Sequence, residues 1–109
     1  MRRFSVLLAD AMSTQQVDDV TSFRGEDETG GFAILGGHAR FMTILSLGLA
    51  RLRVADGKER YLATSGGVLY FHEDTLKLYA RRIFLSDDLD EIRSLLEHQL
   101  REEEQQLVS

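Results

Sequence analysis

Hydrophobic and polar residues alternate along several short segments of the chain. The alternation is clearest over 48–54, where apolar residues interleave with Arg51 and Arg53. A period of two is typical of a β-strand with one buried face and one exposed face. Alternation and apolar content predict further strands at 3–9, 17–24, 58–64, 68–71 and 76–80, and two apolar runs at 32–35 and 41–47.

Glycine and acidic residues separate these segments. The Asp-Gly pair at 56–57 best supplies the positive φ angles of a tight hairpin, so the strands on either side should run antiparallel. The pairs at 66–67 and 73–74 mark two further turns, and 25–31, with three acidic residues, is expected to be a solvated loop. Short strands at this spacing predict an antiparallel β-sandwich or barrel.

The period changes to that of a helix after Ser86. Asp88 can cap a helix together with Glu91 three residues later, and an acidic first turn suits the positive end of the helix dipole. An apolar stripe at helical spacing follows, formed by Leu89, Ile92, Leu96 and Leu100. The run of three glutamates and two glutamines at 102–106 places negative charge at the unfavourable end of the dipole, so we expect this tail to fray or to need a partner.

The length and composition fit a mainly β chain. At 109 residues it is one domain, for which we expect an antiparallel β-sandwich over 1–85 and one C-terminal amphipathic α-helix over 86–109. The formal net charge of -5 disfavours nucleic acid as a partner, because phosphate binding needs concentrated Lys and Arg. The chain has no cysteine, which excludes disulfides and thiolate metal sites, and no apolar run near the roughly 20 residues of a membrane span. No export signal is evident, since Asp10 interrupts the N-terminal apolar stretch.

Motifs for chemistry are missing from the sequence. No phosphate-binding loop is present, and the serine of Ser65-Gly66-Gly67 has no evident base. His38, His72 and His98 never form the His-x-His spacing that puts two metal ligands on one face of a strand. His98 and Glu102 are four residues apart on the expected helix, and we interpret them as a solvated pair. We therefore expect no metal, no cofactor and no catalysis, and an enzyme using His38 is the least supported alternative.

The centre of the chain is the segment 30–47, in which Gly36-Gly37-His38-Ala39 separates the two apolar runs. Two glycines can turn a tight structural corner between strands. The same loop could instead face a partner, or offer backbone N–H groups to an anion. Residue types alone leave these interpretations open.

The residues from Gly31 to Thr43, GFAILGGHARFMT, resemble a motif of the epsilon subunit of F-type ATP synthases (the delta subunit in mitochondria). The corresponding stretch of that family typically reads Gly-x-Ile-x-Pro-Gly-His-Ala-Pro-Leu-x-Thr. Gly48, the hairpin at 56–57 and Ser-Gly-Gly-Val at 65–68 resemble the family in the same order, so the likeness covers nearly the whole chain. The form Gly-His-Ala-x-Phe is similar to the sodium-type branch. Both family prolines are replaced, by Gly36 and Arg40.

The resemblance implies a β-sandwich followed by a helical hairpin, in a subunit without catalytic residues of its own. Such subunits sit at the foot of the central stalk, at the cytoplasmic face of the cell membrane, and link the gamma subunit to the c ring. They help to couple ion translocation to ATP synthesis or hydrolysis. Carried over to this chain, the resemblance implies that the loop contacts a partner through Gly37, His38, Ala39, Arg40 and Phe41.

The segment 89–94, LDEIRS, resembles the family motif Ile/Leu-Asp-x-x-Arg-Ala, with Ser94 in place of the final alanine. In some bacterial members this motif binds ATP as a regulatory ligand, which implies nucleotide contacts at Asp90 and Arg93. The family's site also draws on a second helix, and the chain is expected to have only one. The alternative to a stalk subunit is a free-standing β-sandwich binding module whose acidic tail, at 102–104, would dock to its partner.

Overall fold

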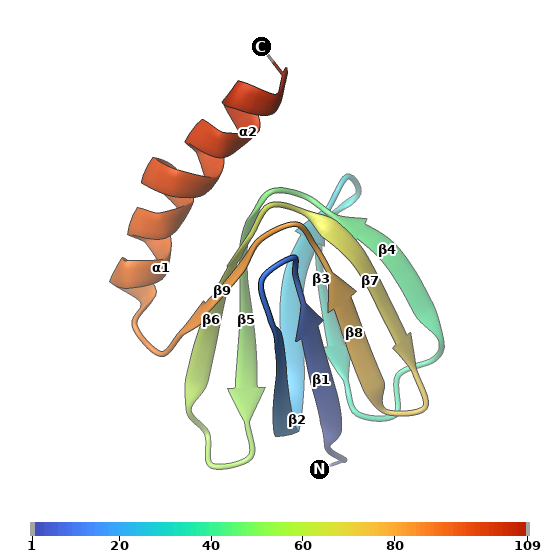
Figure 1. Ribbon diagram of the computed structural model, residues 1–109. Helices are drawn as coiled ribbons and strands as arrows, with labels where there is room; N and C mark the ends of the chain where they lie inside the picture. Colours follow the sequence, from blue (N-terminus) through green and yellow to red (C-terminus); the bar gives the residue numbers. More distant parts are fainter. Residues whose placement is uncertain (1, 109) are drawn as a thin grey trace.

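The computed structural model describes residues 2–108, over which the chain forms nine strands followed by a helical segment (Figure 1). The strands are β1 (Phe4–Ala9), β2 (Thr14–Asp27), β3 (Gly30–Leu35), β4 (Phe41–Leu45), β5 (Gly48–Val54), β6 (Glu59–Thr64), β7 (Gly67–His72), β8 (Thr75–Tyr79) and β9 (Ile83–Ser86). The helical segment consists of α1 (Leu89–Leu95), a π-helical turn η1 (Leu96–Leu100) and α2 (Arg101–Val108).

The long strand β2 joins the two layers of the sandwich. Its first part pairs with β1, and its second part lies between β3 and β5. The change occurs where Asp19 adopts a positive φ of 57° and the register shifts between Val20 and Ser22, which is the signature of a bulge that bends the strand. The path of strands is β4-β7-β8-β1-β2-β5-β6-β9, with β3 beside β2. In Figure 1, β4, β7 and β8 lie on the right of the molecule and β5, β6 and β9 on the left.

The expected antiparallel β-sandwich is confirmed, with one parallel pair. β1 and β8 run parallel, with Val6 opposite Leu76 and Leu8 opposite Leu78. All four of these side chains are buried, as alternation over the two strands predicts. The core between the layers consists of Phe4, Val6, Leu8, Val17, Val20, Phe23, Ile34, Leu45, Ala50, Leu52, Leu62, Leu69, Phe71, Leu76, Leu78 and Ile83.

The prediction of a solvated loop over 25–31 is wrong. β2 continues to Asp27 and β3 begins at Gly30, so that only a tight turn remains between them. The Asp27 carboxylate accepts hydrogen bonds from the Thr29 N–H and hydroxyl and, at 2.6 Å, from the hydroxyl of Thr43 on β4. Asp27 is thus tied to the structure of this hairpin and of its neighbour β4.

A ninth strand was not expected from the sequence. β9 contains four residues and pairs antiparallel with β6 at the edge of the sheet. Ile83 is buried, whereas the other three residues are partly exposed. Four residues with this burial pattern show no alternation that could predict a strand. By pairing with β6, β9 positions the start of α1 at this edge of the sheet.

The helical segment packs on the sandwich through three of the four residues of the expected stripe, whereas Leu89 is half-buried and outside this cluster. Ile92, Leu96 and Leu100 are buried against Ala63 of β6, with Leu49 and other partly buried residues around them. Asp88 caps α1 by accepting hydrogen bonds from the N–H groups of Asp90 and Glu91, while the Glu91 side chain contacts the Ser86 hydroxyl. Among the described residues, no helix has the length and apolar character needed to cross a bilayer.

The acidic tail, which was expected to fray or to need a partner, is helical and contacts the sandwich. α2 continues to Val108, and Glu103 forms an ion pair with Arg82 at 2.9 Å. Arg82 also lies over the ring of Phe84, 4.8 Å from its centroid. The ion pair between Arg82 and Glu103 fixes the helical segment to the connection between β8 and β9. It also gives an internal partner to one of the carboxylates at 102–104 that the alternative function would use for docking.

Asp10 holds together the corner between β1 and β2. Its carboxylate accepts hydrogen bonds from the N–H groups of Met12, Ser13 and Ile83, at 2.8 to 2.9 Å. Burial on its own would raise the pKa of Asp10, but these bonds and the charge of Arg82 outweigh it and hold the pKa below its ordinary value.

Replacing Asp10 with Asn is therefore expected to remove a pH-dependent part of the stability. A carboxyl whose pKa is lowered by folding stabilises the protein above its unfolded pKa of about 4, and this stabilisation is lost as the pH falls through the lower folded value. Urea unfolding should show wild type more stable than the variant at pH 7, and the difference should shrink below about pH 4. A difference that stays constant down to pH 2 would contradict this role.

Candidate partner-binding surface

The loop between β3 and β4 is a tight turn held against the N-terminal segment. The His38 N–H donates to the Leu35 carbonyl at 3.1 Å, and Gly37 has a φ of +81°. A Cβ on Gly36 would lie 2.2 Å from the Arg2 carbonyl oxygen, so no larger residue fits without moving the backbone. The glycines therefore serve the structure of the corner, which is one of the three interpretations that the sequence left open.

Asp74 anchors this loop from the turn between β7 and β8. It accepts a hydrogen bond from the Gly37 N–H at 2.8 Å and forms an ion pair with Arg2. The Gly37 bond is the main cause, and the Arg2 charge a further one, of a pKa of Asp74 below its ordinary value. Glu73 and Asp74 both have positive φ, which is typical of a tight hairpin turn. Three segments of the chain are thus fixed to one another at one end of the sandwich.

The side chains of this loop still face outward. Gly37, His38, Ala39 and Arg40 are exposed, and Phe41 is half-buried. The His38 ring lies edge-on against Phe41 and Phe71, at centroid distances of 5.7 and 6.0 Å, and its Nδ1 is 2.8 Å from the Ala39 carbonyl oxygen. The corner is consequently rigid on its inner side and accessible on its outer side.

Arg40 points toward the end of β7. Its Nε and one terminal nitrogen lie 3.4 Å from the two ring nitrogens of His72. The His72 ring is in turn 3.5 Å from the Glu73 carboxylate. Arg40 stands where the resembled family motif has a proline. It adds a positive charge to the exposed end of the loop, next to the imidazole of His72.

A second surface, which sequence analysis missed, lies on β4, β7 and β8. We define the apolar strand face as Met42, Ile44, Val68 and Tyr79, which are 65, 71, 44 and 48% exposed. Ile44 lies opposite Val68, and Val68 lies opposite Tyr79, so these side chains are cross-strand neighbours. The sequence does carry a signal for this face: over 41–45, apolar residues occur at the positions that face solvent, 42 and 44, as well as at positions on the core side of the strand.

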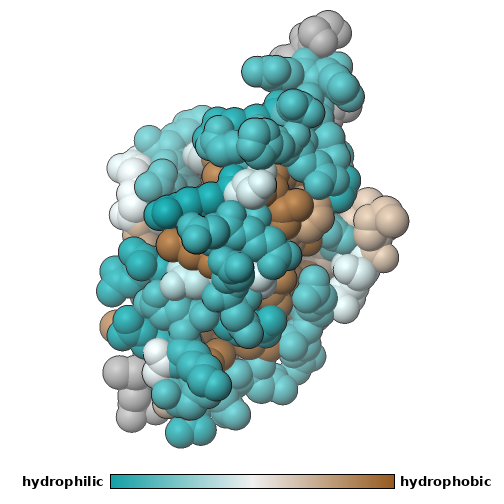
Figure 2. Space-filling view, turned by 90° about the vertical axis from the view of Figure 1, so that its left-hand side faces the viewer, coloured by the Kyte–Doolittle hydropathy of each residue, from teal (hydrophilic) through white to brown (hydrophobic). Residues whose placement is uncertain are grey.

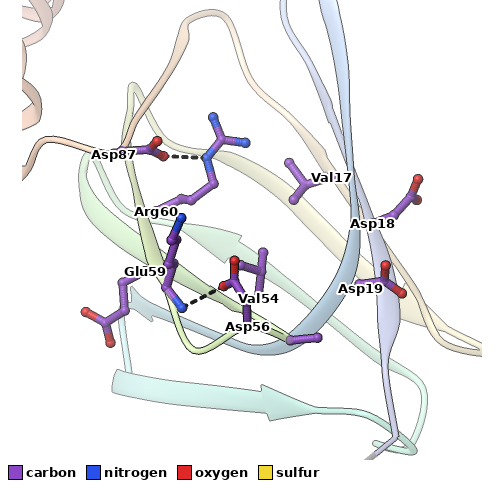
Figure 3. Close-up of a pocket in the computed structure, with 10 residues that line it drawn as sticks. Val17, Asp18, Asp19, Val54, Asp56, Glu59, Arg60 and Asp87 are labelled. Carbon is purple, nitrogen blue, oxygen red and sulfur yellow. Dashed lines mark hydrogen bonds and ion pairs between the residues drawn. The ribbon is translucent and has the colours of Figure 1, made fainter.

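A hollow of about 760 Å³ lies beside the hairpin between β5 and β6 (Figure 3). It is lined by acidic side chains from β2, β6 and the segment before α1. The Asp87 carboxylate pairs with Arg60 at 2.8 Å, and Asp56 accepts the Lys58 N–H at 2.9 Å. Among residues 2–108 as described, no three His, Cys, Asp or Glu side chains could jointly hold a metal ion. These carboxylates act in turns and ion pairs.

The residues of the nucleotide motif do not share one cavity. Arg93 lines a groove between the helical segment and the sheet, whereas the exposed Asp90 is not among the residues that line it. The Asp90 N–H donates to the Asp88 cap at 2.9 Å. Nucleotide binding by Asp90 and Arg93 stays a prediction.

Residues 3–86 match the family model of the ATP synthase delta/epsilon chain β-sandwich domain. The chain belongs to the ATP synthase delta/epsilon family. The family that was predicted from the loop motif and the glycine turns is thereby confirmed.

Two relatives in this family are each called ATP synthase epsilon chain 2. The relative from Cereibacter sphaeroides is 38% identical over 52 residues, which are 48% of this chain and 36% of the relative. The relative from Paraburkholderia xenovorans is 33% identical over 79 residues, which are 72% of this chain and 57% of the relative. The matched parts thus span little more than half of these epsilon chains at most.

Solved structures share the fold of this delta/epsilon chain. A chain of the Euglena gracilis mitochondrial ATP synthase, in a cryo-EM structure of OSCP, F1 and c-ring, gives a TM-score of 0.73 at 16% identity, covering 85% of this chain and 59% of that one. A chain of the Tetrahymena thermophila central stalk and c-ring gives 0.64 at 14% identity, covering 76% and 66%. At these identities the likeness establishes the β-sandwich architecture.

Proposed function

We propose that the chain is a central-stalk subunit of an F-type ATP synthase that links the gamma subunit to the c ring. In this proposal the β-sandwich, expected over 1–85, is the docking body, and the C-terminal helix, expected over 86–109 and described from Leu89 to Val108, covers its side. The subunit helps to couple ion translocation to ATP synthesis or hydrolysis and reaches the cytoplasmic face of the membrane through the complex.

The observation that carries the proposal is that one strand connects two exposed surfaces. The loop over 37–41 leads directly into β4, whose Met42 and Ile44 belong to the apolar strand face. Exposed apolar patches of this kind mark protein interfaces in soluble domains. A stalk subunit that bridges two partners needs two surfaces on one stiff body, and two packed sheets supply that stiffness.

We assign the loop end to the c ring and the apolar strand face to gamma. The family membership and the resemblance of the loop motif support the first assignment. The second is supported by the exposure of three hydrophobic side chains at cross-strand positions, Ile44, Val68 and Tyr79. A free-standing binding module would have the same face, so purification from cells decides between them: a stalk subunit should co-purify with the ATP synthase, and a free module should not.

Charge reversal at Arg40 together with loss of the His38 ring is expected to weaken binding to the c ring by about tenfold or more, which corresponds to about 1.4 kcal/mol. Both side chains are exposed, so the double variant His38→Ala, Arg40→Glu should unfold in urea close to wild type. Lys58→Glu, on the hairpin after β5, is the matched control with the same charge change. Unchanged co-purification and coupled ATP synthesis in the double variant would refute the role of the loop.

A further inference from the structure

A groove of about 660 Å³ lies between the helical segment and the outer face of the sheet. We define the arginine groove by the four arginines that line it, which come from β2, β5, α1 and α2: Arg24, Arg51, Arg93 and Arg101. Glu26 is the acidic residue among those lining it. The groove is therefore locally cationic on a chain whose formal net charge is -5.

Two of these arginines face each other across the sheet. Arg24 of β2 is directly opposite Arg51 of β5, and both are exposed. Like charges directly opposite on neighbouring strands destabilise a sheet, because their side chains project side by side from one face. The pairing follows from the register beyond the bulge at Asp19, so it is fixed by the fold.

Internal carboxylates neutralise these cations only in part. Arg51 is 3.9 Å from Glu59, which at the same time binds Arg53 at 3.0 Å, and Arg101 pairs with Glu97 on its own helix at 3.3 Å. Within the described part of the chain, Arg24 and Arg93 form no ion pair. An anionic ligand would therefore meet guanidinium groups that have hydrogen-bond donors to offer.

The groove also has an apolar floor, formed by residues of the sheet, of the connection before β5 and of the helical segment. Its hydrophobic lining residues are Phe32, Ala33, Leu47, Leu49, Ala50, Leu89 and Leu96. The space-filling view of this side of the molecule shows hydrophobic surface beside the hydrophilic helix (Figure 2). A ligand that fits both the arginines and the apolar floor has apolar groups along one side and negative charges along its edges.

We propose that the arginine groove binds an acidic amphipathic segment of another subunit of the ATP synthase. The inference rests on the proposed function, and it adds a third contact to the loop end and the apolar strand face. Carboxylates of the segment would pair with Arg24 and Arg51 on the sheet and with Arg93 on the helix. Complementary charge would orient the partner and select it against neutral segments.

The spread of the cations favours a segment of chain over a compact phosphate group. Arg93 and Arg101 are eight residues apart on the helical segment, which is about 12 Å at the rise of an α-helix. A single phosphate cannot reach both, and a phosphate would leave the apolar floor uncovered. Several carboxylates at intervals along an amphipathic segment satisfy both conditions.

Zero-length cross-linking in the assembled ATP synthase tests this inference. The variants Arg24→Lys and Arg51→Lys keep the charge and supply an amine, which a carbodiimide joins to a carboxylate in direct contact. The chain has two lysines of its own, Lys58 and Lys77, so wild type provides the background. Arg60→Lys is the matched control, because Arg60 lies outside the groove and pairs with Asp87 of the same chain.

Both groove variants are expected to form a product with the mass of the chain plus one other subunit, and Arg60→Lys should not exceed the wild-type background. Mass spectrometry should place the linked carboxylates in one amphipathic segment. If the chain co-purifies with the ATP synthase but links only within itself, the inference is wrong and the proposed function stands. If inorganic triphosphate binds saturably and Arg24→Gln, Arg51→Gln abolishes that binding without any intersubunit link, the groove is a phosphate site instead. If the chain does not co-purify, the proposed function fails and the inference falls with it.

Discussion

Replacing Ile44 with Asp is expected to weaken binding to the gamma subunit by about 30-fold or more, which corresponds to a hot spot of about 2 kcal/mol. Ile44 is the most exposed residue of the apolar strand face, at 71%, and it lies opposite Val68. Association would bury the new carboxylate among apolar side chains without a partner, and an unpaired charge in such a place is costly. Calorimetry with purified gamma measures the loss.

The matched control for this variant is Met12→Asp. Met12 is 80% exposed in the turn between β1 and β2, so it provides the same change of an exposed apolar residue into a carboxylate. Both variants should keep the wild-type midpoint of urea unfolding, because neither side chain is part of the core. Equal binding of gamma by Ile44→Asp and wild type would show that the apolar strand face has another purpose.

Replacing Phe71 with Ala is expected to lower the free energy of unfolding by about 3 to 5 kcal/mol, the usual cost of removing a buried aromatic ring. Phe71 has no exposed surface and meets Phe4 edge-on at a centroid distance of 5.4 Å. Its ring also supports that of His38, 6.0 Å away. The same change should therefore loosen the loop, which hydrogen exchange at the His38 amide, bonded to Leu35, would report.

Because domains of this size are stable by only about 5 to 15 kcal/mol, Phe71→Leu provides a milder test. Leucine refills most of the cavity, so we expect a loss of roughly 1 to 2 kcal/mol with the fold retained. The loop should still exchange faster than in wild type, since the flat face under His38 is gone. A leucine variant with wild-type exchange at His38 would separate the core from the loop and refute the link between them.

The sequence predicted those elements whose pattern is long and local. The strand over 48–54 and the hairpin at 56–57 follow from alternation and from an Asp-Gly pair, and the helical stripe follows from four apolar residues at helical spacing. The predicted cap at Asp88 also formed. In each case the deciding physical interaction lies within the segment or between its immediate neighbours.

Elements that depend on distant parts of the chain could not be predicted in this way. Three acidic residues over 25–31 indicated a loop, yet the strand pairing of β2 with β3 continues through most of that segment. The parallel pairing of β1 with β8 joins residues some 70 positions apart, and no local period encodes it. β9 has only four residues and owes its place to β6.

The candidate surfaces also differ in whether a local sequence signal or the pairing of distant segments determines them. Glycines and a histidine between apolar runs are a local signal for a turn at 36–39, but the prediction that residues 37–41 face a partner came from the resemblance to the family motif. The sequence did not indicate the apolar strand face, because apolar residues at both alternating positions say only that two faces are hydrophobic and not which one lacks cover. The arginine groove depends on the register that puts Arg24 opposite Arg51, and that register depends on the bulge in β2.

Cysteine protection in the assembled ATP synthase tests the two-surface account most directly. The chain has no cysteine, so His38→Cys, Met42→Cys and Met12→Cys each introduce a single thiol, at the loop, on the apolar strand face and at an exposed control site. In the isolated chain all three should react with a maleimide at similar rates. In the complex we predict strong protection of the first two positions and continued labelling at the third. Equal labelling of all three positions in the complex would contradict the account.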